Sequence, residues 1–270
     1  MKGMEYWTCD TEEVKGLIEW MRKYNNDKAE DEKLKFYGFD CQSLEGPLSA
    51  LSDYITEFDK QNADDFVERL PKLTECNSLY YRLGVGENGE KEISEFLGTI
   101  SFIENWFHEK ENLYVTSSGR VKFDRASYNC QVLRQTMLGR EPSKVKLKQN
   151  QVRDSCMAQN IKWIYGLENS KVFVWAHNAH ISKDYSYRGI QYKRMGSFLM
   201  DNFGKNYYNI GFVFSKGRFQ AQESKKPYRV KEYCLPVYKK NSLTNSLAIP
   251  GLEAYFIELR GSENPLFNTV

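Results

Sequence analysis

The hydrophobic positions of the chain recur with a helical period through most of its first 165 residues. Apolar residues between Val14 and Met21 stand at i, i+3, i+4 and i+7, and Asp10 and Thr11 precede them as candidate N-caps. Further apolar stripes predict helices near residues 44–58, 93–107, 132–137 and 153–165. The pattern therefore predicts an almost wholly helical stretch between residues 44 and 165.

The period changes after this helical stretch. Residues 171–176 form a nearly continuous apolar run, typical of a strand buried on both faces, and residues 207–214 form another. A helix predicted at residues 195–203 lies between them, and this order favours a right-handed crossover in a parallel sheet. Other strand-like segments are residues 34–40, 229–237 and 254–259.

These elements predict an α/β fold with a mostly parallel sheet and a long helical insertion. The predicted catalytic-like domain combines residues 1–43 with residues 168–270, and the helical insertion subdomain spans residues 44–167.

Composition narrows the class of protein. The 270 residues are 41% hydrophobic and 27% charged, which excludes a disordered chain, and the net charge of +2 argues against nucleic acid as a partner. No apolar run reaches the ~18 residues of a membrane span, and no signal peptide is evident. The six cysteines form no CxxC pair, so we expect reduced thiols and a cytoplasmic protein.

The candidate chemistry lies where predicted strands end. Ligands of open parallel sheets bind beyond the carboxyl ends of the strands, which here are followed by Asp40 and by the sequence His177-Asn178-Ala179-His180. Histidine titrates near neutrality and is the commonest general acid or base, so His177 and His180 are the candidate catalytic residues. The third histidine, His108, lies in a helical stripe and is expected to be structural.

Other reaction classes lack their signatures. A histidine pair supplies only two metal ligands, although the fold could recruit Asp40 or Asp184, and no HExxH occurs, so we predict no metal and no cofactor. No GxSxG elbow is present, which favours water as the nucleophile of a hydrolase. The GxGxxG-like spacing at residues 84–89 follows no strand, so it does not predict a dinucleotide site.

Arg153-Asp154 opens the helix that leads to the histidine strand. It is either a surface charge pair or the source of an arginine that orients an anionic group. On the second interpretation Arg153 and Asp40 line the site and bind substrate.

Several motifs, in order along the chain, resemble the erythromycin esterase family. The strongest is Trp175–His180, and the resemblance covers most of the chain. The other motifs are Trp7–Glu13, Glu19–Asn25, Phe36–Asp40, Arg153-Asp154 with Met157 and Asn160, Met195-Gly196, Ile210–Phe212, and Gly217 with Phe219.

The resemblance implies a hydrolase that opens the macrolactone ring of 14-membered macrolides with water as nucleophile. It places His177 and His180 in the active-site cleft. A small-molecule ester or macrolactone is then the expected partner, with no nucleic acid or membrane involved.

The chain departs from the family pattern at its start. The family carries a GExxHG-type motif upstream of the Trp7 block, and here six residues precede Trp7. We therefore expect the base of that motif, its glutamate partners and the first strand to be missing, and His177 or His180 to act as base. The alternative is a truncated, non-catalytic member or a ligand-binding pseudo-enzyme.

Overall fold

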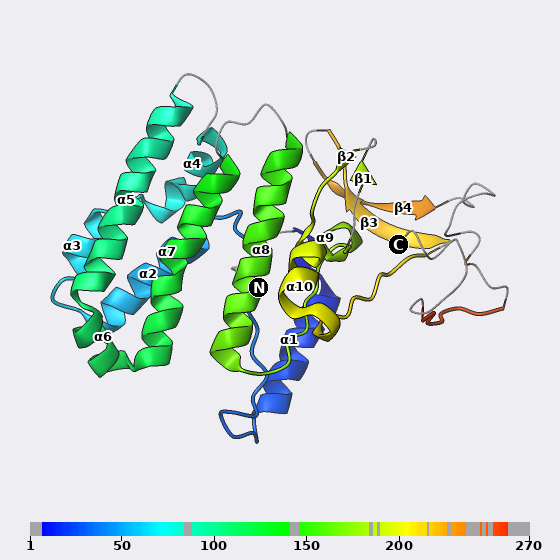
Figure 1. The fold of residues 1–270 in the computed structure, drawn as a ribbon, viewed down its shortest axis with the longest axis horizontal. Coiled ribbons are helices and arrows are strands. Elements are labelled where there is room, and N and C mark those ends of the chain that lie inside the picture. The colour runs from blue at the N-terminus through cyan, green and yellow to red at the C-terminus, as the bar shows by residue number, and fades with distance from the viewer. Residues whose placement is uncertain are drawn as a thin grey trace. The chain divides into compact units, whose positions relative to one another are not determined.

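The computed structural model describes residues 7–83, 88–140, 146–183, 186–187, 190–214, 216–225, 228–235, 244, 247 and 251–258. The chain divides into two compact units, Met1–Val174 and Trp175–Val270, which are described one after the other (Figure 1). No helix among these described residues combines the length and the apolar composition needed to cross a bilayer.

The described part of the first unit is helical. Helices α5, α7 and α8 lie side by side and alternate in direction (Figure 1). Its elements are η1 (Trp7–Cys9), α1 (Glu12–Asn25), α2 (Glu45–Phe58), α3 (Ala63–Glu68), η2 (Leu73–Glu75), α4 (Cys76–Arg82), α5 (Gly89–Glu109), α6 (Glu111–Ser118), α7 (Arg120–Arg140) and α8 (Lys146–Glu168). The helices predicted from the apolar stripes are thus confirmed.

Local sequence explains where helix α1 begins and ends. The Thr11 hydroxyl accepts the Val14 N–H at 3.3 Å, so Thr11 is the N-cap rather than Asp10. Glu12 and Glu13 occupy the first turn and basic residues the last, as the helix dipole favours.

The core of the first unit is built from the apolar stripes of α2, α5 and α7. Side chains such as Leu51, Ile100 and Leu133 are completely buried. The ring of Tyr54 stacks on Phe107 with centroids 5.7 Å apart and meets Tyr114 edge-on. This aromatic contact joins α2 to the α5–α6 corner.

A buried carboxylate fixes the same corner. Asp59, at the end of α2, accepts hydrogen bonds from Lys110 at 2.7 Å and from the Tyr114 hydroxyl at 2.8 Å. Burial alone would raise the pKa of Asp59, but these donors and Asn62 outweigh it and lower the pKa. The charge is therefore retained and paired inside the helical unit.

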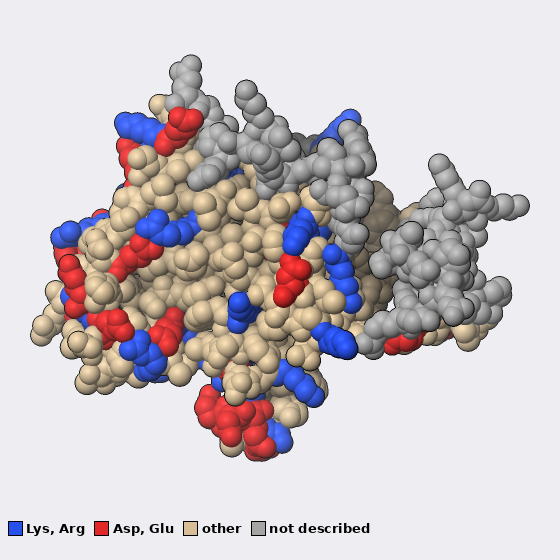
Figure 2. Space-filling model, viewed as in Figure 1, with Lys and Arg blue, Asp and Glu red and all other residues tan. Residues whose placement is uncertain are grey.

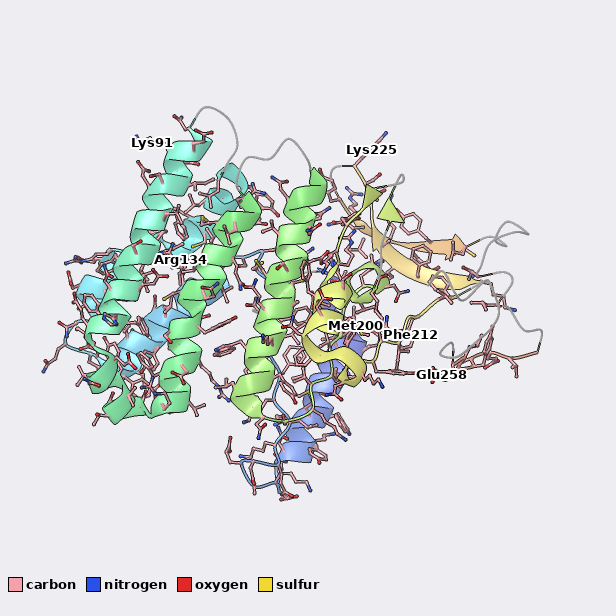
Figure 3. All side chains as sticks on the ribbon, in the orientation of Figure 1. Lys91, Arg134, Met200, Phe212, Lys225 and Glu258 are labelled. Atoms are coloured by element: carbon pink, nitrogen blue, oxygen red, sulfur yellow. The ribbon has the colours of Figure 1, made fainter. Side chains whose placement is uncertain are left out.

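Charged groups on the helical unit are mixed in sign. On the face drawn in Figure 2, acidic and basic side chains are interspersed over most of the surface, and one acidic cluster stands at its lower edge. Arg134 of α7, labelled in Figure 3, makes a two-pronged ion pair with Glu104 of α5, both contacts at 2.5 Å.

The second unit consists of short elements. They are α9 (Asn178–Ile181), β1 (Ser186–Tyr187), β2 (Ile190–Gln191), α10 (Met195–Phe203), η3 (Gly204–Asn206), β3 (Gly217–Gln222) and β4 (Val230–Leu235). Strands β3 and β4 pair antiparallel from Gly217 opposite Leu235 to Gln222 opposite Val230. The rings of Phe219 and Tyr233 stack across this ladder at 5.8 Å.

The prediction of a mostly parallel sheet is wrong. The described residues contain two sheets, β1–β2 and β3–β4, and each has two antiparallel strands. The segments predicted as strands at residues 34–40, 171–176 and 207–214 lie outside any described ladder. An apolar run favours extended backbone, but a strand also requires a neighbouring strand, which the run itself does not specify.

Side chains of these segments are also more exposed than those of a strand inside a sheet would be. Phe173 is 88% exposed and Phe212, labelled in Figure 3, is 80% exposed. Both faces of a central strand would be covered. Strand β4 lies within the predicted segment 229–237, of which residues 236–237 are outside the described part. In the predicted segment 254–259, the described residues 254–258 form no ladder.

One glycine is required by a close approach in the second unit. A Cβ atom at Gly196, in the first turn of α10, would lie 2.0 Å from the Ile181 carbonyl oxygen. This distance is far below van der Waals contact, and the obstacle is backbone rather than a movable side chain. Only glycine therefore allows α10 to pack on α9.

We predict that Gly196→Ala destabilises the protein by about 2 kcal/mol or more, because the chain must shift to relieve the clash. Gly98→Ala is the matched control, since Gly98 is exposed on α5 with open space around its Cβ position. The control should stabilise by roughly 0.5–1 kcal/mol through helix propensity. Urea unfolding followed by circular dichroism measures both, and equal effects would contradict the close approach.

Candidate functional site

The four site residues predicted from sequence occupy two places. Asp40 and Arg153 meet in the first unit, and His177 and His180 lie together in the second. The guanidinium of Arg153 grips the Asp40 carboxylate with two hydrogen bonds, Nε to Oδ1 at 2.9 Å and Nη2 to Oδ2 at 2.6 Å. Arg153 thus pairs with Asp40, which lies 113 positions away in the sequence. This long-range contact argues against the interpretation of Arg153-Asp154 as only a surface charge pair.

The environment of this pair is intermediate between core and solvent. The side chains of Arg153 and Asp40 are 25% and 31% exposed. Burial by itself would lower the pKa of Arg153, but the hydrogen bonds and the negative charge of Asp40 outweigh it and raise the pKa. The guanidinium is therefore permanently charged and can present N–H groups to a ligand.

The chain leading to Asp40 is held by one face of α8. The Asn160 amide donates to the Phe39 carbonyl at 2.9 Å, between the contacts that Arg153 and Glu168 make with the same extended segment. From Arg153 to Glu168 the helix rises ~22 Å, and an extended chain covers ~17 Å from residue 35 to residue 40. The two lengths match within the reach of the Lys35 and Arg153 side chains.

Glu168 anchors the far end of this segment. Its carboxylate accepts hydrogen bonds from Lys35 at 2.5 Å, from Arg125 of α7 at 2.6 Å and from the Tyr37 hydroxyl. Burial would raise the pKa of Glu168, but the three donors lower it to about 2. Burial and the Glu168 contact raise the pKa of Tyr37 to about 12, so this phenol stays a donor.

Two buried thiols complete the contact between the segment and α8. Cys41 and Cys156 are 5% and 3% exposed, and each thiol lies close enough to the other to shift its pKa. The nearby Cys156 and burial raise the pKa of Cys41, while the nearby Cys41 lowers the pKa of Cys156. Cys156 is therefore the more acidic thiol of the pair.

Sequence reasoning missed Glu168, Arg125 and the cysteine pair. At 100° per residue, Arg153, Cys156, Asn160 and Glu168 fall on one face of α8, but the apolar Met157 and Ile164 fall within the same arc. The sequence therefore contains no distinct polar face that would have indicated a docked segment.

The histidine motif forms a single helical turn in the second unit. His177 is the N-cap of α9, and its Nδ1 accepts the Ala179 N–H at 3.1 Å. A neutral imidazole carries one proton, so with Nδ1 accepting, the proton is on Nε2. The exposed His177 ring therefore presents an N–H donor, while His180 lies half-buried in the same turn.

Asn178 ties this turn to residues 207–214. Its side chain donates to the Phe212 carbonyl at 2.6 Å and accepts the Phe212 N–H at 3.1 Å, as a neighbouring strand would. Two more side chains, Tyr207 and Asn209, donate to the Ile181 carbonyl at 2.8 and 3.2 Å. The extended segment is thus fixed to α9 through side chains.

Other candidate sites add little. In the described ranges no three His, Cys, Asp or Glu side chains gather as metal ligands. Asp184 and residues 84–87 of the glycine-rich loop lie outside the described residues. A groove of about 620 Å³ in the first unit is lined by His108 and by the stacked rings of Tyr128 and Trp163, 3.8 Å apart, and holds none of the four site residues.

Comparison with known proteins places the chain in a family. The family model described as Erythromycin esterase matches residues 1–268. No curated protein matches the chain by sequence.

Solved structures share the fold at low identity. A Bacillus cereus protein has a TM-score of 0.76 and 23% identity, and the match covers 96% of this chain and 62% of that one. A succinoglycan biosynthesis protein has a TM-score of 0.65 and 20% identity, over 84% and 54% of the two chains. A mutant of the erythromycin esterase EreC in its open conformation has a TM-score of 0.55 and 18% identity, over 86% and 61%. The chain thus spans about three-fifths of the length of these relatives.

We predict that Glu168→Gln lowers the free energy of unfolding at pH 7 and flattens its decline in acid. The pKa of Glu168 is about 2 in the folded protein, against an ordinary value of 4.5. The carboxylate therefore stabilises the fold above pH 4.5, and this contribution is lost as the pH falls toward 2.

Urea unfolding at several values between pH 7 and pH 3 measures the effect. Glu19→Gln, at an exposed carboxylate of α1, is the matched control and should leave the pH profile unchanged. Parallel profiles for the wild-type chain and Glu168→Gln would contradict the assignment.

Proposed function

The chain belongs to the erythromycin esterase family, and from this premise we propose that it is a carboxylic-ester hydrolase that opens a macrolactone with water as nucleophile. The observation that carries the proposal is the histidine turn, where His177 presents an Nε2–H donor beside His180. A donor is what the developing oxyanion of ester hydrolysis requires.

The proposed roles of the two histidines follow from their nitrogen atoms. His177 donates from Nε2 to the carbonyl oxygen as it becomes an oxyanion. His180 takes the proton of the attacking water and returns it to the leaving alkoxide. The water oxygen bonds to the acyl carbon, the ester C–O bond breaks, and the product is the ring-opened hydroxy acid, heavier than the substrate by one water.

Asp40 and Arg153 are proposed to bind substrate rather than to react. Their half-buried ion pair offers a fixed row of N–H donors and carboxylate oxygens to the hydroxyl and carbonyl groups of a polyoxygenated ring. Since both prongs of Arg153 are directed at Asp40, the pair is positioned before substrate arrives, which reduces the entropic cost of binding.

A ligand-binding member without catalysis is the second candidate function. The orientation of His177 favours it in one respect, because a ring that already accepts at Nδ1 cannot also serve as the base while neutral. Of the two histidines, only His180 would then be available as the base. Binding of a macrolide without turnover would distinguish this alternative.

We predict that the chain converts erythromycin to a product one water heavier, and that His177→Ala lowers the rate about 100-fold or more through loss of one oxyanion donor. Mass spectrometry of the incubated macrolide measures this. His108→Ala, at the exposed histidine of α5, is the matched control and should retain the wild-type rate. A folded His177→Ala variant with the wild-type rate would refute the role of His177, and no product from the folded wild-type chain would refute macrolide hydrolysis.

We further predict that Arg153→Lys raises KM about tenfold with a smaller change in kcat, because lysine keeps the charge but loses the two-pronged geometry. Arg134→Lys is matched to it, since Arg134 makes the same two-pronged pair with Glu104 inside the helical unit. Steady-state kinetics on both variants test the assignment. A fall in kcat at constant KM for Arg153→Lys would argue against substrate binding.

A further inference from the structure

The contact between Cys41 and Cys156 serves no step of the proposed hydrolysis. All six cysteines are free thiols, and these two are buried against each other. They belong to elements far apart in sequence, the end of the extended segment and the middle of α8. Such a pair is a candidate for covalent bonding.

The backbone on both sides of the pair is already positioned. The Cys41 N–H donates to Asp40 Oδ1 at 2.8 Å, and Asp40 is gripped by Arg153, one turn before Cys156. Asn160, one turn after Cys156, holds the Phe39 carbonyl at 2.9 Å. Phe39 and Asp40 are thus held to α8 on either side of Cys156, and Cys41 follows directly after them, which places the two thiols in one neighbourhood.

We propose that Cys41 and Cys156 form a reversible disulfide that staples the Asp40-bearing segment to helix α8. The oxidant is a low-molecular-weight disulfide. This inference does not depend on the proposed hydrolase activity.

The chemistry follows from which thiol is more acidic. The nearby Cys41 lowers the pKa of Cys156, so Cys156 is the attacking thiolate. It displaces one thiol from the small disulfide and forms a mixed disulfide. Cys41 then loses its proton and attacks the Cys156 sulfur, which releases the second small thiol. Two protein thiols are oxidised and one small disulfide is reduced to two thiols.

Burial sets the rate of this reaction. Both sulfurs lie beneath the surface, so the oxidant reaches them when the extended segment opens locally. The partly exposed Asp40–Arg153 pair lies beside them, and its release is part of that opening. Oxidation is therefore slow, and the closed staple then resists opening.

The staple would stabilise the fold and the candidate site together. It closes a loop of more than a hundred residues, which restricts the unfolded chain. It also holds Asp40 opposite Arg153. An oxidised chain should therefore melt at a higher temperature than a reduced one.

The test treats the folded full-length chain with oxidised glutathione or with dithiothreitol. Free thiols are then alkylated in denaturant and tryptic peptides are mapped by mass spectrometry without reduction. We expect one cross-linked peptide pair that joins Cys41 to Cys156, two hydrogens lighter than the reduced pair. The midpoint of thermal unfolding should rise by roughly 5 °C or more on oxidation.

Two cysteine-to-alanine variants distinguish the effect of the disulfide from the effect of removing any buried thiol. Cys156→Ala should abolish the rise in melting temperature, whereas Cys130→Ala, at a comparably buried cysteine of α7, should retain it. Alkylation of both Cys41 and Cys156 after glutathione treatment would overturn the proposal. A persistent glutathione adduct on Cys156, or a bond from Cys41 to another cysteine, would also overturn it.

Discussion

The extended segment Lys35–Cys41 has no strand to pair with among the described residues, and the candidate site depends on how this constraint is met. A strand satisfies its backbone through a neighbouring ladder. Here the Asn160 amide donates to the backbone carbonyl of Phe39, while Arg153 and Glu168 hold the segment through its side chains Asp40, Lys35 and Tyr37. Because these contacts run from Glu168 at Lys35 and Tyr37 to Arg153 at Asp40, the segment lies antiparallel to the helix.

The second unit meets the same constraint in the same way. Residues 207–214 lie in no described ladder, and Asn178 bonds both backbone groups of Phe212. Asn178 belongs to the motif that carries the family resemblance, as do Asp40, Arg153 and Asn160. Motif residues of this chain therefore hold extended segments in place, and the histidines stand next to these structural contacts.

The histidine turn also shows why a motif alone leaves its chemistry open. His177 and His180 are equivalent in sequence terms, since either imidazole can serve as acid, base or donor. The single hydrogen bond from the Ala179 N–H to Nδ1 of His177 removes this equivalence. The roles proposed for the two histidines rest on that bond, which depends on the local turn rather than on residue type.

The sequence by itself determined the helices, the position of the histidine motif after an apolar run, and the family resemblance. A helix is made of local hydrogen bonds between residues four apart, so apolar stripes such as those of α2, α5 and α7 are sufficient to predict it. Tertiary structure alone decided the pairing of Asp40 with Arg153, the anchoring by Glu168, the contact of Cys41 with Cys156 and the absence of a parallel sheet in the described residues. These contacts join segments more than forty residues apart, and the pattern of one segment does not specify which other segment packs against it.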